Sequence, residues 1–203
     1  MNRVAKRTLD VTLAGLGIVL SSPLWAVIAA AIKLDSDGPV FFQQARVGAA
    51  GRPFLVLKFR SMIADAERAS GPLQAEDADP RVTRVGRLLR ATAMDELPQL
   101  WNIFRGDMSF VGPRALRPEE MEVAGGEVIP LERIPGFEER CAVPPGLTGI
   151  AQIYAPRDIT RRQKFRFDRL YIQRQSFLLD VRLIALSFWI SLRGTWETRA
   201  KKF

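Results

Sequence analysis

The run "VTLAGLGIVLSSPLWAVIAAAI" at residues 11–32 decides what kind of fold this chain adopts. It contains no Asp, Glu, Lys or Arg, and about 20 apolar residues are enough for a helix to cross a bilayer. A cleaved signal peptide has a shorter apolar region that ends at a small-residue cleavage site. The longer run therefore predicts a segment that stays in the membrane.

The centre of this run, Ser21-Ser22-Pro23, indicates a break. Proline removes a backbone donor and kinks a helix, and serine hydroxyls can pair with the carbonyls that it frees. Two structures fit: a kinked helix that spans the membrane, or a re-entrant hairpin. Each arm of a hairpin would reach roughly 15–18 Å, about half of a ~30 Å hydrocarbon core.

The charges that flank the run favour the hairpin. Three basic residues lie before residue 8, and Lys33 follows the run. Basic flanks prefer the cytoplasmic side of a membrane, and a hairpin places both flanks there. We therefore expect a membrane hairpin at residues 1–34 and a domain on the cytoplasmic face at residues 35–203.

Composition limits the chemistry of the chain. Its net charge of +8 over 203 residues points to polyanionic partners: nucleic acid, phosphorylated metabolites or an anionic membrane. The absence of histidine excludes Ser-His and Cys-His catalysis and leaves acid–base work to carboxylates, Lys, Tyr or water. The single cysteine, Cys141, excludes an intrachain disulfide and a Cys-rich zinc site.

The remaining patterns predict an α+β fold that is mostly helical. Two apolar or alternating runs at residues 40–48 and 52–62 surround "GAAGR" and predict a β-hairpin. Residues 65–80 are typical of a mobile loop. Arginines at every third position from residue 81 to residue 90 predict a short helix with a basic stripe. Residues 161–194 have a helical pattern, and its uncharged run at residues 183–192 is too short to span a bilayer. A buried core helix fits this run, and an interfacial helix fits Trp189 and the flanking Arg182 and Arg193 slightly better.

Asp95 and Glu96 form an adjacent acidic pair in a basic chain. Thr92 and Asp95 match a capping pattern, and Pro98 is tolerated in a first turn, so the pair is consistent with a simple helix start. A chemical role is the alternative. Further along, the turn at Gly112-Pro113 presents Arg114, whose guanidinium could bind phosphate.

Several motifs in a fixed order resemble one family. They are the broken N-terminal segment, "KFRSM" at 58–62, "DPRVTRVGRLLR" at 79–90, "DELPQLWNIFRGDMSFVGPR" at 95–114, "PGLTGIAQ" at 145–152 and "FDRLYIQRQSFLLD" at 167–180. Over nearly its whole length the chain resembles the bacterial sugar transferases, the monotopic polyprenol-phosphate phosphoglycosyl transferases. It is similar to their small form, which consists of the catalytic domain only.

The resemblance implies a reaction. A sugar-1-phosphate would pass from a nucleoside diphosphate sugar, usually a UDP-sugar, to undecaprenyl phosphate, and UMP would leave. In this family the acid matching Asp95 is the nucleophile that carries a covalent phosphosugar, and Mg²⁺ is the cofactor, here expected at Asp95. Glu96 is expected to act as a base that accepts a proton or to orient the lipid phosphate. The residues expected to bind phosphate or substrate are Lys58, Arg60, Arg90, Arg114, Gln152 and Arg157.

The resemblance also implies a location. Ser22 and Pro23 match the break of the family's re-entrant helix, so the protein is expected in the bacterial inner membrane with its site facing the cytoplasm. The expected partners are the two substrates and membrane lipid but no nucleic acid, with a homodimer as a possible assembly. Residues 152–163 depart from the family pattern, which leaves the sugar undefined.

Two rival functions remain. A membrane-bound basic protein that binds nucleic acid or lipid head groups without catalysis would also carry a +8 charge, although no nucleic-acid-binding motif occurs. An enzyme that transfers the sugar alone would release UDP in place of UMP. The nucleotide that leaves separates the second rival from the phosphosugar reaction.

Overall fold

A computed structural model describes residues 2–64, 66, 79–124, 127–156, 159–194 and 196. The helices are α1 (Arg3–Asp35), α2 (Arg84–Ala91), α3 (Gln99–Arg105), α4 (Phe137–Cys141), α5 (Ile150–Tyr154), α6 (Arg161–Arg174) and α7 (Phe177–Leu192). The strands are β1 (Phe41–Val47), β2 (Pro53–Phe59), β3 (Ser109–Val111), β4 (Met121–Ala124), β5 (Glu127–Pro130) and β6 (Gly146–Thr148). The α+β architecture with predominant helix is as predicted. Most of the loop predicted at residues 65–80 lies outside the described residues.

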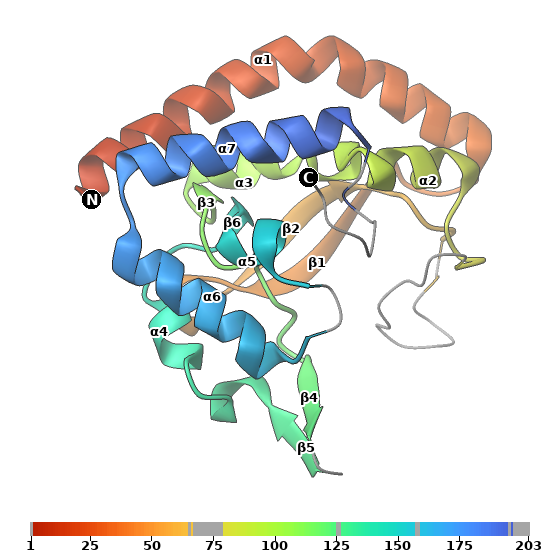
Figure 1. Cartoon of the computed structure of the whole chain (residues 1–203). Helices are drawn as coiled ribbons and strands as arrows, with labels where there is room; N and C mark the ends of the chain where they lie inside the picture. The colour runs from red at the N-terminus through yellow and green to blue at the C-terminus, as the bar shows by residue number, and fades with distance from the viewer. Residues whose placement is uncertain are drawn as a thin grey trace.

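Helix α1 is one continuous helix of 33 residues with Pro23 inside it. The hydroxyl of Ser21 donates to the carbonyl of Gly17 at 2.6 Å, and that of Ser22 donates to the carbonyl of Val19 at 2.9 Å. Figure 1 shows α1 as an arch that bends near its middle over the rest of the molecule. The predicted break is therefore a bend and not an interruption, because these hydroxyls pair with carbonyls in the turn before the proline.

Buried polar contacts fix the N-terminal end of α1 to the domain below it. Lys6 forms an ion pair of 2.6 Å with Asp180 of α7, and its ammonium also donates to the hydroxyl of Tyr171 at 3.2 Å. One turn further on, Asp10 accepts hydrogen bonds from the hydroxyl of Ser109 and the backbone N–H of Phe110. These contacts join the first turns of the chain to residues about a hundred or more positions away.

The C-terminal end of α1 lies on the same domain. Ile28 and Ile32 pack in one apolar cluster with Phe59 and Leu89. Between the two ends one face of α1 packs on the core, where Ala14 is fully buried in a cluster with Leu100 and Ile103. The opposite face exposes apolar side chains, and Leu20 reaches 79 % exposure. By length and composition α1 could cross a membrane, yet both of its ends contact one body. Its exposed apolar arch needs an environment other than water.

The predicted β-hairpin is confirmed. Strands β1 and β2 pair antiparallel, with Gln44 opposite Val56 and Phe42 opposite Lys58. The edge of β2 is held by Asn102 of α3, whose side chain accepts from the N–H of Leu57 at 2.9 Å and donates to the carbonyl of Leu55 at 2.8 Å. The hairpin is thereby tied to the helix that follows the acidic pair.

Two glycine-bearing loops cross at the centre of the molecule. Strands β3 and β6 pair in parallel, and Gly146 also bridges to Arg114. A Cβ atom on Gly112 would lie 2.4 Å from the carbonyl oxygen of Pro144, and one on Gly146 would lie 2.0 Å from the amide nitrogen of Gly112. Only glycine allows the backbones to approach so closely. This crossing sets the position of Arg114.

The C-terminal segment forms two helices, α6 and α7, which are separated at Gln175 and Ser176. Helix α7 has features of both a buried core helix and an interfacial helix, the two alternatives that its sequence allowed. Leu183 and Ile190 are fully buried in an apolar cluster, whereas Phe188 and Leu192 are each 67 % exposed. One face of α7 thus belongs to the core, and the other adds to the exposed apolar surface beside α1 (Figure 1).

Candidate active site

The acidic pair lies in a tight connection between α2 and α3. Thr92 does not cap the following helix, as its pattern predicted: its hydroxyl donates to the carbonyl of Leu88 at 2.8 Å, at the end of α2. Ala93 then adopts the left-handed conformation with φ of 55°, and residues Met94–Glu96 form a 3₁₀ turn. The capping prediction was wrong because the chain reverses between Thr92 and Asp95, and α3 begins only at Gln99.

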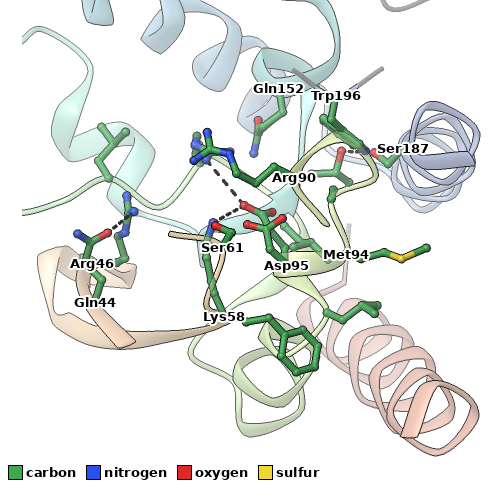
Figure 2. Close-up of a pocket in the computed structure, with 18 of the residues that line it drawn as sticks. Gln44, Arg46, Lys58, Ser61, Arg90, Met94, Asp95, Gln152, Ser187 and Trp196 are labelled. Carbon is green, nitrogen blue, oxygen red and sulfur yellow. Dashed lines mark hydrogen bonds and ion pairs between the residues drawn. The ribbon is translucent and has the colours of Figure 1, made fainter. Parts of the chain in front are cut away.

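This reversal brings Asp95 into a cavity of about 1910 Å³. The cavity is lined by all of the predicted phosphate, substrate and catalytic residues that the structure describes, which are Lys58, Arg60, Arg90, Asp95, Glu96, Arg114 and Gln152. Figure 2 shows Asp95 beside Lys58 and Ser61, with Arg90 and Gln152 on the opposite side of the same space. Arg157, the remaining predicted residue, lies outside the described residues.

Glu96 is paired with two cations. Lys58 lies 2.5 Å and Arg114 lies 3.8 Å from its carboxylate. Burial alone would raise the pKa of Glu96, but the charges of Lys58 and Arg114 outweigh burial and lower this pKa to about 2. Glu96 is therefore a carboxylate at neutral pH, and a group with so low a pKa is a weak proton acceptor.

Asp95 lines the same cavity as its neighbour Glu96. It is 8 % exposed and lines the cavity together with the guanidinium-bearing residues Arg90 and Arg114. A carboxylate oxygen is a nucleophile toward phosphorus when surrounding cations neutralise the phosphate charge. The cavity therefore places a buried carboxylate among cationic side chains.

Arg60 and Gln152 have contacts that favour a structural role. The guanidinium of Arg60 donates to the carbonyls of Ser36 at 2.6 Å and of Asp37, just after the last turn of α1. The amide of Gln152 donates to the carbonyls of Gly112 and Gly146, across the two crossing loops. Arg60 anchors the C-terminal end of α1, and Gln152 holds together the loops that position Arg114.

Sequence patterns did not identify Arg46, which also lines the cavity. It lies in β1, donates to the carbonyl of Ala115 at 3.1 Å and to the side chain of Gln44 at 2.6 Å, and is 3.7 Å from Glu120. Figure 2 shows Arg46 and Gln44 together at one side of the cavity. The sequence placed Arg46 in a predicted strand. It did not reveal that this side chain faces the cavity, because the face of the hairpin that lines the cavity is set by tertiary contacts.

The charge of the cavity wall is strongly unbalanced. Nine basic residues and five acidic residues line it among those described. The described part of the chain has no group of three or more Asp, Glu, His or Cys residues that could hold a metal by themselves. Such a wall is typical of a site for a polyanion, and a divalent cation bound there would need oxygen ligands from the polyanion itself.

Comparisons with known proteins identify the family of the chain. The model of the bacterial sugar transferase family matches residues 1–194. The chain is 44 % identical over 186 residues to the UDP-glucose:undecaprenyl-phosphate glucose-1-phosphate transferase of Caulobacter vibrioides, covering 88 % of this chain and 66 % of that protein. It is 38 % identical over 189 residues to the exopolysaccharide production protein PSS of Rhizobium leguminosarum bv. phaseoli, covering 91 % and 93 % of the two.

A third relative is named for a different sugar. The UDP-N-acetylgalactosamine-undecaprenyl-phosphate N-acetylgalactosaminephosphotransferase of Aeromonas hydrophila is 43 % identical over 193 residues, which cover 93 % of this chain and 44 % of that protein. The chain spans between 35 % and 66 % of the length of four of the curated relatives that it matches, the Caulobacter protein among them. The family match nevertheless covers nearly all of this chain, and the chain belongs to the bacterial sugar transferase family.

Proposed function

We propose that this protein transfers a sugar-1-phosphate from a nucleoside diphosphate sugar to undecaprenyl phosphate, as the first membrane step of a bacterial glycan pathway. The names of its relatives support a UDP-sugar as donor. The single observation that carries the proposal is the placement of Asp95: a buried carboxylate inside a basic cavity, beneath an exposed apolar helix. A soluble anionic donor and a lipid phosphate could both reach it there.

The first half of the proposed reaction forms a bond between a carboxylate oxygen of Asp95 and the β-phosphorus of the donor. The bond between that phosphorus and the bridging oxygen breaks, and the nucleoside monophosphate leaves with this oxygen. Lys58, Arg90 and Arg114 line the cavity around Asp95 and would stabilise the charge on the phosphate oxygens. The product is an acyl phosphate, in which the phosphosugar is joined to the aspartate by a mixed-anhydride bond.

In the second half an oxygen of undecaprenyl phosphate attacks the same phosphorus. The bond to Asp95 breaks, which restores the carboxylate and yields an undecaprenyl diphosphate sugar. A phosphate oxygen is already anionic at neutral pH, so this attack needs no general base. We therefore assign Glu96, whose pKa is lowered to about 2, to holding Lys58 and Arg114 in place and not to moving a proton.

Mg²⁺ is the proposed cofactor. We propose Asp95 as its protein ligand, because this carboxylate lines the basic cavity in which the diphosphate would bind. Mg²⁺ is commonly bound by one or two carboxylates plus substrate phosphates and water, which fits a wall with few acidic groups. When bound, the ion would neutralise charge on the diphosphate.

We also propose that α1 enters the bacterial inner membrane and returns, with the site at the cytoplasmic surface. The contacts of Lys6 at one end and of Ile32 at the other hold both ends of α1 on one domain. If α1 crossed the bilayer completely, the contacts at one of its two ends would have to break. The exposed residues of the arch, together with Phe188 and Trp189 of α7, supply the apolar surface for lipid.

The nucleotide product tests the proposal. Purified protein in detergent, given a UDP-sugar, undecaprenyl phosphate and Mg²⁺, should release UMP and form a lipid-linked diphosphate sugar. A panel of UDP-sugars would identify the sugar. Release of UDP would instead support transfer of the sugar alone, and the absence of any nucleotide release across the panel would contradict the proposal.

A further inference from the structure

A group of basic residues lies around Glu120 in the wall of the cavity. We call Arg46, Arg117, Arg161 and Lys164 the distal basic cluster; all four line the cavity. Arg161 lies 2.6 Å and Arg46 lies 3.7 Å from the carboxylate of Glu120. The cluster is assembled from β1, from the segment that precedes β4 and from the first turn of α6, so it exists only in the folded chain.

The positive charges of this cluster repel one another. Burial, followed by the charges of Arg114 and Arg117, lowers the pKa of Arg46 to about 10 from its ordinary value of 12.5. Glu120 and Glu96 offset this repulsion only in part. A buried cation that its neighbours repel indicates that an anion belongs beside it.

The wall of the cavity has a different character near the helix α1. Leu24 of α1, Phe41 and Phe42 of β1 and Phe188 of α7 line it there, and each is at least 38 % exposed. Figure 1 shows that β4 and the start of α6 lie on the opposite side of the molecule from α1. The cavity therefore has an apolar end beside the exposed apolar helices and a basic end away from them.

We infer that the distal basic cluster is the subsite for the nucleoside monophosphate part of the donor, the group that leaves in the first half-reaction. The inference rests on the proposed function. The donor would lie with its nucleotide phosphate at Arg46, Arg117 and Arg161 and its β-phosphorus at Asp95. The lipid phosphate would approach from the apolar end, where its chain finds apolar side chains. The two half-reactions would thus share Asp95 and use opposite ends of the cavity.

The cluster offers variants that leave the reactive carboxylate untouched. Arg161→Gln and Lys164→Gln change two half-buried side chains of α6 that line the cavity. Arg166→Gln is the matched control, because Arg166 is an exposed arginine of the same helix that does not line the cavity. All three substitutions remove one positive charge from one helix.

UMP binding to the full chain in detergent, measured by isothermal titration calorimetry, tests the subsite. We expect the Kd for UMP to rise roughly tenfold in Arg161→Gln, the loss typical of one hydrogen bond to a charged group, and to rise in Lys164→Gln. Arg166→Gln should match the parent. Uridine, which lacks the phosphate, should bind the parent much more weakly than UMP.

The half-reactions give an independent readout. Transfer from the preformed phosphosugar protein to undecaprenyl phosphate should be unchanged in Arg161→Gln, whereas the KM for the UDP-sugar should rise. If both cluster variants bind UMP as the parent does, or if only the lipid half-reaction is impaired, the subsite is wrong. If the cluster variants bind UMP more weakly than the parent but the parent transfers no phosphosugar, the subsite stands and the proposed function fails.

Discussion

Two buried ion pairs in this molecule are built from the same groups but have different surroundings. Lys6 and Asp180 lie 2.6 Å apart between α1 and α7, and the second carboxylate oxygen of Asp180 accepts from the hydroxyl of Tyr171. Lys58 and Glu96 lie 2.5 Å apart between β2 and the turn before α3. The first pair is enclosed by protein, whereas the second lines a cavity with a surplus of positive charge.

The comparison shows that a buried charge pair does not by itself mark a reactive site. The enclosed pair is satisfied within the protein: the hydroxyl of Tyr171 also lies 3.0 Å from the carbonyl of Val111, and burial together with Asp180 raises the pKa of Tyr171 far above its usual value. The pair of Lys58 and Glu96 lies in a cavity wall that keeps an excess of positive charge and that also contains the carboxylate of Asp95. Open space and unbalanced charge therefore distinguish the second region.

The largest expected effect separates the two regions by activity. Asp95→Asn keeps the shape of the side chain but removes the nucleophile, so turnover should fall by roughly 10³-fold or more. The thermal midpoint should stay close to that of the parent. UMP release and a melting curve on one preparation measure both quantities, and a variant with parental turnover would show that Asp95 is not the reacting group.

The enclosed pair should respond in the opposite way. Asp180→Asn leaves the ammonium of Lys6 buried without its counter-charge, which should cost about 3–5 kcal/mol of stability. The fraction that remains folded should keep its turnover number, since neither residue lines the cavity. Denaturant unfolding and active-site titration measure the two quantities, and the double variant Lys6→Met, Asp180→Leu should recover part of the loss. A stable but inactive Asp180→Asn would contradict the comparison.

The open pair makes a prediction about pH. Because the folded pKa of Glu96, about 2, lies below its ordinary value of 4.5, the stability that its ion pairs contribute is fully present above about pH 4.5. This contribution is lost as pH falls through the folded pKa. The stability difference between the parent and Glu96→Gln should thus be constant from pH 5 to 8 and shrink on acidification. A difference that instead changed between pH 6 and 7 would reveal a titrating base.

The smallest expected effect concerns the turn that separates the two acidic residues from α2. Ala93 has φ of 55°, where a Cβ atom costs about 1–2 kcal/mol. Ala93→Gly should leave stability unchanged or raise it slightly, while Ala93→Val should lower it and reduce activity by displacing Asp95. Equal melting temperatures for the two variants would mean that this backbone conformation is not held in solution.

Local signals predicted more of the fold than of the site. The hairpin of β1 and β2 followed from alternation around a turn, and the bend of α1 followed from Pro23. The role of Thr92 could not be predicted, because a Ser/Thr-x-x-acid pattern does not reveal that the preceding helix ends in a reversal. The Lys6–Asp180 pair joins residues 174 positions apart. A contact between residues so distant in the sequence leaves no local pattern from which it could be predicted.

The site shows the same division. Asp95, Glu96 and Lys58 were identified by family motifs, and the folded chain brings all three to one cavity. Arg46 and Glu120 were missed because their importance arises from the meeting of β1, the segment before β4 and α6. Arg60 lies in the family motif at residues 58–62, yet its hydrogen bonds to the end of α1 favour a structural role.

The central claim is that Asp95 forms a covalent bond to the phosphosugar. Incubation with a UDP-sugar and Mg²⁺ in the absence of lipid acceptor, followed by peptide mass spectrometry, tests it most directly. We expect one adduct with the mass of a sugar phosphate on Asp95, which disappears when undecaprenyl phosphate is added and never forms in Asp95→Asn. An adduct on another residue, or full turnover with no adduct at all, would contradict it.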